Sequence, residues 1–240
     1  MISHRTPLLL MILLLAGCTT PRGAAPGQAA APAAEASLAP ASQSDLYLGV
    51  VDGLIRQQRY EAAIAFLAKY QKSQTLTPRY HKLAGDALAG AGRTDEALAA
   101  YRMALKSDFA AEAYNGIGRA LSASGRWAEA SENFRQAATL DPANAGYLNN
   151  FGYAQLKQNF RGADLAPVVS ELQRAHELEP GSGVIRDNLA LALALSGSRA
   201  EFLTFLETIP DPGRRKQVAE FSANWTSTWA GDTGFKGSTP

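Results

Sequence analysis

The fold of this chain is decided by the stretch from Ala111 to Asn144, which reads AEAYNGIGRALSASGRWAEASENFRQAATLDPAN. Small and apolar residues recur in this stretch at spacings of three and four, as they do on the buried face of an amphipathic helix. Gly125 separates two such groups, and Pro142 follows the second group. Glycine often ends a helix in a left-handed conformation, and proline cannot continue one. The stretch therefore predicts a pair of helices.

The same pattern returns along the chain with a period of about 34 residues, which is typical of a helix-pair repeat. The interval from Gly85 to Gly118 equals the interval from Tyr101 to Phe134, and each is one repeat long. We expect Gly118 and Ala130 to be small because the two helices of a pair cross closely there, with Phe134 filling the space beside them. One helix pair cannot bury its apolar face alone, so successive pairs must stack. The sequence therefore predicts an all-α solenoid.

The predicted organisation has five copies of the helix pair. They cover residues 44–77, 78–110, 111–144, 145–182 and 183–210. The fourth copy is longer than the others, because the interval from Gly152 to Ala175 exceeds the equivalent interval from Gly118 to Ala137 by four positions. We expect the four extra residues near 161–164. The first helix of the fifth copy is almost wholly apolar, which indicates that a further element covers it.

Residues 211–240 are expected to supply that element and a tail. An amphipathic helix is predicted from Arg214 to Trp229, with Val218, Phe221, Trp225 and Trp229 on its apolar face. Solenoids need a terminal element with a polar outer side, so we interpret this helix as a cap. The alternative is that the aromatic side chains form a strip that binds a partner.

Residues 111–144 resemble the tetratricopeptide repeat, matching nearly every position that defines it. The resemblance implies a ligand that is an extended or helical peptide, laid in a groove along the first helix of each pair. It places seven residues on that groove: Lys82, Asp86, Asn115, Arg119, Asn149, Tyr153 and Asp187. The alternative is a merely solvated face. Asn150 and Asn188 occupy an offset related to the family's clamp for a chain terminus, but the accompanying lysines are missing.

The composition argues against several other functions. The chain has 23 basic and 22 acidic residues, for a net charge of +1, whereas nucleic-acid binding needs clustered positive charge. One cysteine and three histidines leave no ligand set for a zinc site. No serine, cysteine or histidine lies in an arrangement typical of a nucleophile and its base. We therefore expect no enzyme activity, no metal or cofactor, and no small-molecule substrate.

Residues 1–43 predict a membrane anchor and a tether. An apolar run from Leu8 to Leu15 follows His4 and Arg5, and it ends in Leu15-Ala16-Gly17-Cys18. This resembles a bacterial lipobox, which implies a signal peptide over residues 1–17 and lipid attached to Cys18. The alternative is an ordinary signal peptide with a chance cysteine. Residues 18–43 are rich in alanine and proline, which is typical of a disordered linker. Thr19 follows the cysteine. In the lipoprotein family, Asp at this position is associated with retention in the inner membrane, so the resemblance implies the outer membrane, with the protein facing the periplasm.

Anchor, tether and repeats together resemble the tetratricopeptide lipoproteins of bacterial pilus and secretion machines, in particular those of Flp/Tad pilus assembly. That resemblance implies a pilotin-like adaptor whose partner is a secretin or its C-terminal segment. Alternatives are a pilotin of type IV pili, and a periplasmic scaffold or regulator of a cell-envelope enzyme. The sequence does not distinguish among these partners.

Overall fold

A computed structural model describes residues 43–159 and 164–233, with side chains throughout except at 159 and 225–233. The described residues form eleven α-helices and no strand, and the helices all belong to one compact unit. The helices are α1 Gln43–Arg56, α2 Tyr60–Tyr70, α3 Pro78–Gly90, α4 Thr94–Arg102, α5 Ala110–Ala123, α6 Trp127–Leu140, α7 Ala145–Asn159, α8 Ala166–Leu178, α9 Gly183–Leu195, α10 Arg199–Glu207 and α11 Pro212–Thr233. The prediction of an all-α fold is confirmed.

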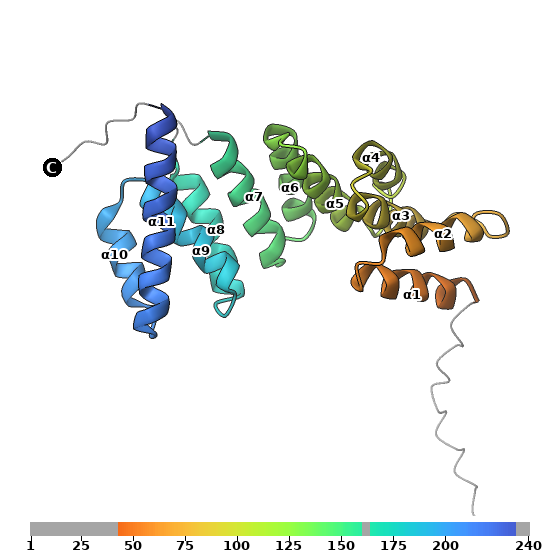
Figure 1. Ribbon diagram of the computed structural model, residues 1–240, viewed down its shortest axis with the longest axis horizontal. Coiled ribbons are helices and arrows are strands. Elements are labelled where there is room, and N and C mark those ends of the chain that lie inside the picture. Colours follow the sequence, from red (N-terminus) through yellow and green to blue (C-terminus); the bar gives the residue numbers. More distant parts are fainter. Residues whose placement is uncertain (1–42, 160–163, 234–240) are drawn as a thin grey trace, which may run out of the picture. The chain divides into compact units, whose positions relative to one another are not determined.

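The helices stack as consecutive pairs, which is the arrangement of a solenoid (Figure 1). Helices α1, α3, α5, α7 and α9 are the first helices of five pairs, and each packs against the second helix of its own pair. Each also contacts the helix that precedes it in the chain, except α1, which begins the described residues. The expected insertion in the fourth pair falls at residues 161–163, outside the described part of the chain, and at the adjacent Asp164.

A glycine on the first helix facing a large side chain on the second recurs in successive pairs. A Cβ added at Gly118 would lie 2.6 Å from the ring of Phe134, and one at Gly85 would lie 2.5 Å from Tyr101. Both distances are shorter than atoms can approach, so only glycine allows these crossings. Phe134 and Tyr101 are themselves buried. The packing predicted around Gly118 is therefore confirmed.

The turn between the first and second helix requires a left-handed residue. Gly125 has a φ of +74° one residue beyond the C-cap of α5, as the sequence predicts. The first pair has no glycine at the equivalent position, and Gln58 takes a φ of +58° there. A side chain in this region costs about 1–2 kcal/mol, so the turn of the first pair carries backbone strain that the turns at Gly92, Gly125 and Gly197 avoid.

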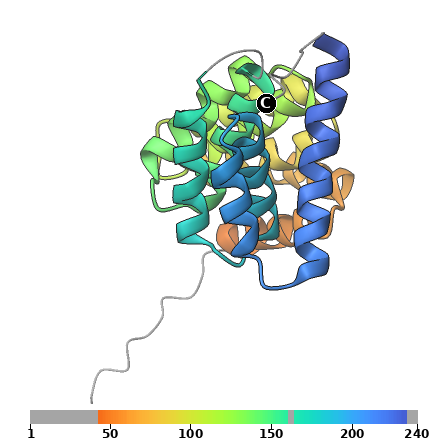
Figure 2. The same ribbon diagram turned by 90° about the vertical axis from the view of Figure 1, so that its left-hand side faces the viewer.

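Helix α11 covers the last pair and contacts both α9 and α10, as Figure 2 shows. Val218 is only 1% exposed and packs with Ala190, Leu206 and Ile209. The predicted apolar face of this helix is wrong at Phe221, which is 40% exposed. Ser222, four residues after Val218, is the neighbour that faces inward. The side chains of Trp225 and Trp229 lie outside the described residues. The C-terminal capping helix itself is therefore present, rotated from the expected register.

Candidate functional site

A hollow of about 770 Å³ opens along the first helices α1, α3 and α5. Four of the seven residues that the sequence placed on a groove line this hollow, namely Lys82, Asp86, Asn115 and Arg119. The helices bring these side chains together because equivalent positions on stacked first helices recur once per repeat and face the same side. The hollow is thus a surface built by repetition.

An ordered polar group forms the floor of the hollow. Tyr101 of α4 is 2% exposed, and its hydroxyl donates a hydrogen bond to Asp86 Oδ1 at 2.8 Å. Burial, together with the Asp86 carboxylate, raises the pKa of the Tyr101 phenol, which therefore stays protonated as a donor. Lys82 Nζ lies 2.9 Å from the other oxygen, Asp86 Oδ2. Asp86 is thus held in place by two neighbours and neutralised by one of them.

Helix α5 adds two charges of opposite sign that face the hollow. Glu112 and Arg119 both line it, seven residues or about 10 Å apart along the helix. Arg119 is exposed, and within the described part of the chain its guanidinium makes no hydrogen bond or ion pair. The Glu112 carboxylate likewise has no such partner among the described residues. These two side chains can therefore exchange water for a ligand without first breaking an internal contact.

Aromatic side chains border the hollow toward α7. Trp127 and Tyr147 line it, and burial followed by the charge of Glu112 raises the pKa of Tyr147 to about 12. Tyr153 does not line the hollow, although its ring meets Trp127 edge-on with centroids 6.0 Å apart. Lys157 Nζ lies 5.3 Å from the Trp127 centroid. Tyr153 is therefore beside the hollow, where it orients one of its walls.

The prediction that Asn149 faces a ligand is wrong. Asn149 is 7% exposed, and its Oδ1 accepts a hydrogen bond of 2.9 Å from Asn188 of α9. One step earlier in the stack, Asn115 Oδ1 accepts a similar bond of 2.9 Å from Asn150 of α7. These carboxamide pairs tie consecutive first helices together. Asn150 and Asn188, which the sequence related to a terminus clamp, serve this internal purpose.

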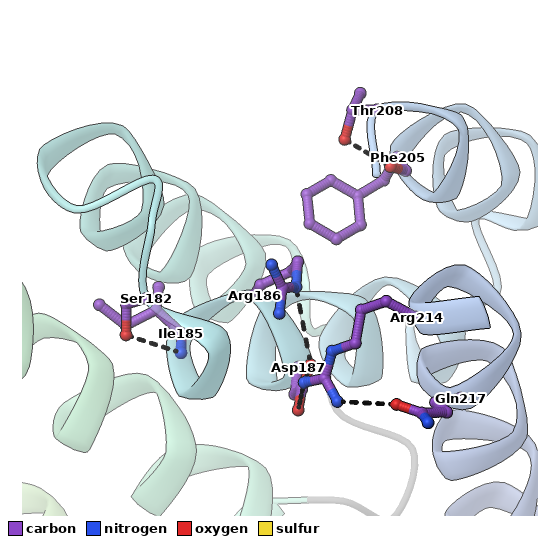
Figure 3. A network of polar contacts seen from close by, with 8 residues as sticks. All are labelled: Ser182, Ile185, Arg186, Asp187, Phe205, Thr208, Arg214 and Gln217. Atoms are coloured by element: carbon purple, nitrogen blue, oxygen red, sulfur yellow. Dashed lines mark hydrogen bonds and ion pairs between the residues drawn. The ribbon is translucent and has the colours of Figure 1, made fainter. Parts of the chain in front are cut away.

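Asp187 is likewise not part of the hollow. Arg214 of α11 reaches both oxygens of its carboxylate, at 2.9 and 2.7 Å, as Figure 3 shows. Arg214 also donates to Gln217 on its own helix, and Arg186 Nε lies 3.8 Å from Asp187 Oδ1. One nitrogen, Arg214 Nη2, donates both bonds, and hydrogen bonds between charged groups are stronger than those between neutral groups. Asp187 therefore anchors the capping helix.

The pairs between first helices explain where the hollow lies. Arg79 of α3 donates to Asp45 of α1 at 3.2 Å, and α5, α7, α9 and α11 are joined by the contacts above. Between α3 and α5, by contrast, no described side chain forms a hydrogen bond or ion pair across the two helices. The series of side-chain contacts between first helices is therefore interrupted between α3 and α5, where the hollow lies.

Sequence reasoning missed several residues of this site. Asp52 and Arg56 of α1 line the hollow and form an ion pair of 2.8 Å. Asp52 lies one repeat before Asp86, so the repeat period could have found it. Tyr147 had no such signal, because the equivalent position in α5 is the buried Ala113. Bulky side chains at such positions reach the groove only when the local stacking leaves room.

The described residues show no metal centre. They contain no cluster of three side chains able to hold a metal ion. His81 meets the ring of Tyr80 edge-on, His176 meets Phe205 in the same way, and burial lowers the pKa of both imidazoles. Within the described part of the chain, no helix is both long and apolar enough to cross a membrane.

Stacked helix pairs are the architecture of a class of protein, the helical-repeat solenoid. Residues 48–114 match a model described as tetratricopeptide repeat, and residues 118–159 match one described as TPR repeat. These two segments of the chain are therefore similar to tetratricopeptide repeats. Proteins of this kind are in general scaffolds for protein partners and not catalysts.

Similar proteins of known sequence and structure agree with this fold. The TPR repeat-containing protein PA4299 of Pseudomonas aeruginosa is 29% identical over 183 residues, covering 75% of this chain and 71% of the relative. The crystal structure of YrrB, described as a TPR protein with an unusual peptide-binding site, has a TM-score of 0.57 at 18% identity and covers 72% of this chain and 90% of that one. MamA from Desulfovibrio magneticus RS-1 has a TM-score of 0.56 at 19% identity, with coverages of 76% and 97%. At these identities, the two structures support the fold alone.

Proposed function

We propose that the hollow binds a segment of a partner protein, extended or helical, that carries charges of both signs. The observation that supports this most is the pair of uncompensated charges on α5, Glu112 and Arg119, beside the ordered group of Lys82 and Asp86. A segment with a basic side chain near Glu112 and an acidic one near Arg119 would complete both pairs. YrrB, a protein of the same fold, is described as having a peptide-binding site.

The mixed charge of the hollow also favours a protein segment over a nucleic acid as its ligand. Nucleic acids need a continuous positive surface, because affinity comes largely from phosphate contacts. The lining of the hollow instead combines acidic Asp52, Asp86 and Glu112 with basic Arg56, Lys82 and Arg119. A protein segment can meet such a mixture with side chains of its own, and complementary charges specify its direction in the groove.

We further propose that the chain is a lipoprotein of the outer membrane, held by lipid on Cys18, and acts as a pilotin-like factor for a secretin. The proposal rests on the lipobox resemblance of Leu15 to Cys18 and on the family of Flp/Tad pilus lipoproteins, of which TadD is the protein that the chain resembles. Cys18 and the tether lie outside the described residues. Two acyl chains or more hold a protein at a membrane stably, whereas one chain does so only marginally.

Co-purification with the secretin tests this role. We expect the full chain, extracted from membranes in mild detergent, to retain the secretin, and Cys18→Ala to retain it equally well. In the variant, the secretin should be absent from the outer-membrane fraction. The reason is that the repeats bind the secretin, whereas the lipid directs the complex to the outer membrane. Retention of the secretin is measured by immunoblotting after gentle solubilisation of membranes. Its location is measured by immunoblotting of membranes separated by density. Absence of secretin from the wild-type complex would refute the partner, and correct placement by Cys18→Ala would refute the anchor.

A further inference from the structure

One end of the hollow, at the C-termini of α3 and α5, is lined by small residues and two aromatic ones. Ala89 and Gly90 lie on the last turn of α3, and Ala123 is the last residue of α5. Tyr60 and Trp127, the first residues of α2 and α6, line the hollow as well. We call these five residues the apolar end of the hollow.

The repeat period explains why this end is open. Tyr60, Thr94 and Trp127 have the same position in three successive pairs, as the first residues of α2, α4 and α6. Thr94 is small and does not line the hollow. Tyr60 packs onto α3, because a Cβ added at Gly90 would overlap its ring. Small residues therefore occupy the place where the middle pair would otherwise add a third ring, and a large apolar side chain of a ligand can take that place.

A single stripe of α5 connects the apolar end with the two charges described above. Glu112, Arg119 and Ala123 follow one another at intervals of seven and four residues, so they share one side of the helix, and all three line the hollow. Along the helix axis, Glu112 lies about 10 Å from Arg119, and Arg119 lies about 6 Å from Ala123. A ligand along this stripe therefore meets an acidic, a basic and an apolar position in that order.

These intervals favour a helical ligand over an extended one. A helix laid along α5 has the same rise per residue, and its positions i, i+4 and i+11 share one side, so all three can face the stripe. A strand rises about 3.3 Å per residue, so the same distances correspond to about two and three residues. Side chains alternate between the two faces of a strand, so residues three positions apart point in opposite directions. A strand could therefore not turn both of its charges toward α5.

The stack of first helices also leaves width for a helix. Helices α1 and α5 both contact α3, which lies between them. Packed helices are about 8–10 Å apart, so α1 and α5 are separated by roughly 16–20 Å. A helix with its side chains is about 10–12 Å across. A ligand helix can therefore lie over α3, between α1 and α5.

We propose that the segment bound in the hollow is a helix with a large apolar, an acidic and a basic residue at positions i, i+4 and i+11. The apolar side chain enters the apolar end, between Tyr60 and Trp127. The acidic side chain pairs with Arg119, and the basic one pairs with Glu112. In this order the ligand runs antiparallel to α5, and its acidic residue lies nearer its N-terminus, where the helix dipole favours negative charge. This pattern rests on the proposed function, the binding of a partner segment in the hollow.

Selection of peptides tests the apolar contact. The full chain in detergent micelles is used to select from a phage-displayed library of random 16-residue peptides, and the affinity of enriched peptides is measured by fluorescence polarisation. We expect the enriched peptides to share the pattern at i, i+4 and i+11. Ala123→Trp fills the apolar end from an exposed position and should weaken binding at least tenfold. Ala99→Trp is the matched control, exposed on α4 outside the hollow, and should leave the affinity within twofold.

Reversal of one charge tests the register of the ligand. Arg119→Glu should weaken binding of the same peptides at least tenfold. A peptide whose acidic residue at i+4 is replaced by lysine should regain affinity for Arg119→Glu and lose it for the wild type. Helical circular dichroism should be unchanged in all three variants, because the substituted positions are exposed.

The possible failures are distinguishable. Enriched peptides with the three residues at i, i+2 and i+5 would indicate an extended segment and overturn the helix. Full affinity of Ala123→Trp, with weak binding by Arg119→Glu, would overturn the apolar contact and leave the proposed function standing. Full affinity of both variants, or no enriched peptide at all, would contradict the proposed function as well.

Discussion

Val218→Asp is expected to release α11 from the last pair. Val218 is 1% exposed and packs between α9 and α10, so the substitution would bury an ionised carboxylate without a partner. A carboxylate buried without a partner costs about 3–5 kcal/mol, and detachment of the helix avoids that cost. The helix would detach and leave the buried residues that pack with Val218, namely Ala190, Leu206 and Ile209, exposed to water.

Limited proteolysis with trypsin measures this release, because Arg214, Arg215 and Lys216 supply cleavage sites at the start of α11. We expect cleavage there to accelerate at least tenfold in Val218→Asp and to stay near the wild-type rate in Phe221→Asp. The control variant lies on the same helix but is 40% exposed. If Phe221→Asp released the helix as strongly as Val218→Asp, the apolar face expected from the sequence would be right and the observed one wrong.

Gly116→Ala is expected to lower the free energy of unfolding by about 1–3 kcal/mol, although alanine favours helix over glycine by about 1 kcal/mol. The added methyl carbon would lie 2.4 Å from Tyr101, and that ring cannot retreat because Gly85 lies against it on the other helix. Displacing Tyr101 also breaks its hydrogen bond to Asp86 on the floor of the hollow. Both stability and partner binding should therefore fall.

Gly49→Ala is the matched control, because it has the same position in the first repeat. Its added carbon would meet no atom within 4 Å, so only the preference for helix acts, and the free energy of unfolding should rise by about 0.5–1 kcal/mol. Urea unfolding followed by circular dichroism measures both variants. The packing account requires the free energy of unfolding to fall in Gly116→Ala and to rise in Gly49→Ala. A stabilised Gly116→Ala would contradict it.

The fold could be predicted from the sequence because repetition makes the signal redundant. Gly85 with Tyr101, and Gly118 with Phe134, occupy equivalent positions in two successive repeats. Both pairs therefore predict the same close crossing of a first and a second helix, and the structure contains both crossings. The register of α11 had no such repetition. Val218 can share a face with Phe221 or with Ser222, and the second arrangement places Arg214 on the same side as Val218, within reach of Asp187. That contact joins residues 27 positions apart, which a local pattern does not reveal.

The candidate site was predictable only in part, for a similar reason. Lys82, Asp86, Asn115 and Arg119 line the hollow as their repeat positions suggest. Asn149 has the same position as Asn115 and accepts the equivalent bond from the next first helix, yet it is buried and does not line the hollow. Position within a repeat says which side of the helix a residue occupies. Whether the next pair leaves that side open depends on the distance between pairs, and the sequence pattern does not contain that distance.

The claim that the hollow holds a partner is tested most directly by a photo-reactive amino acid placed at position 119, compared with one at position 102. Arg119 lines the hollow from α5, whereas Arg102 is exposed on α4 and does not line it. After irradiation of membranes that contain the full chain, the account predicts one cross-linked adduct from position 119, containing the secretin, and none from position 102. Equal adducts from both positions, or none from position 119, would contradict it.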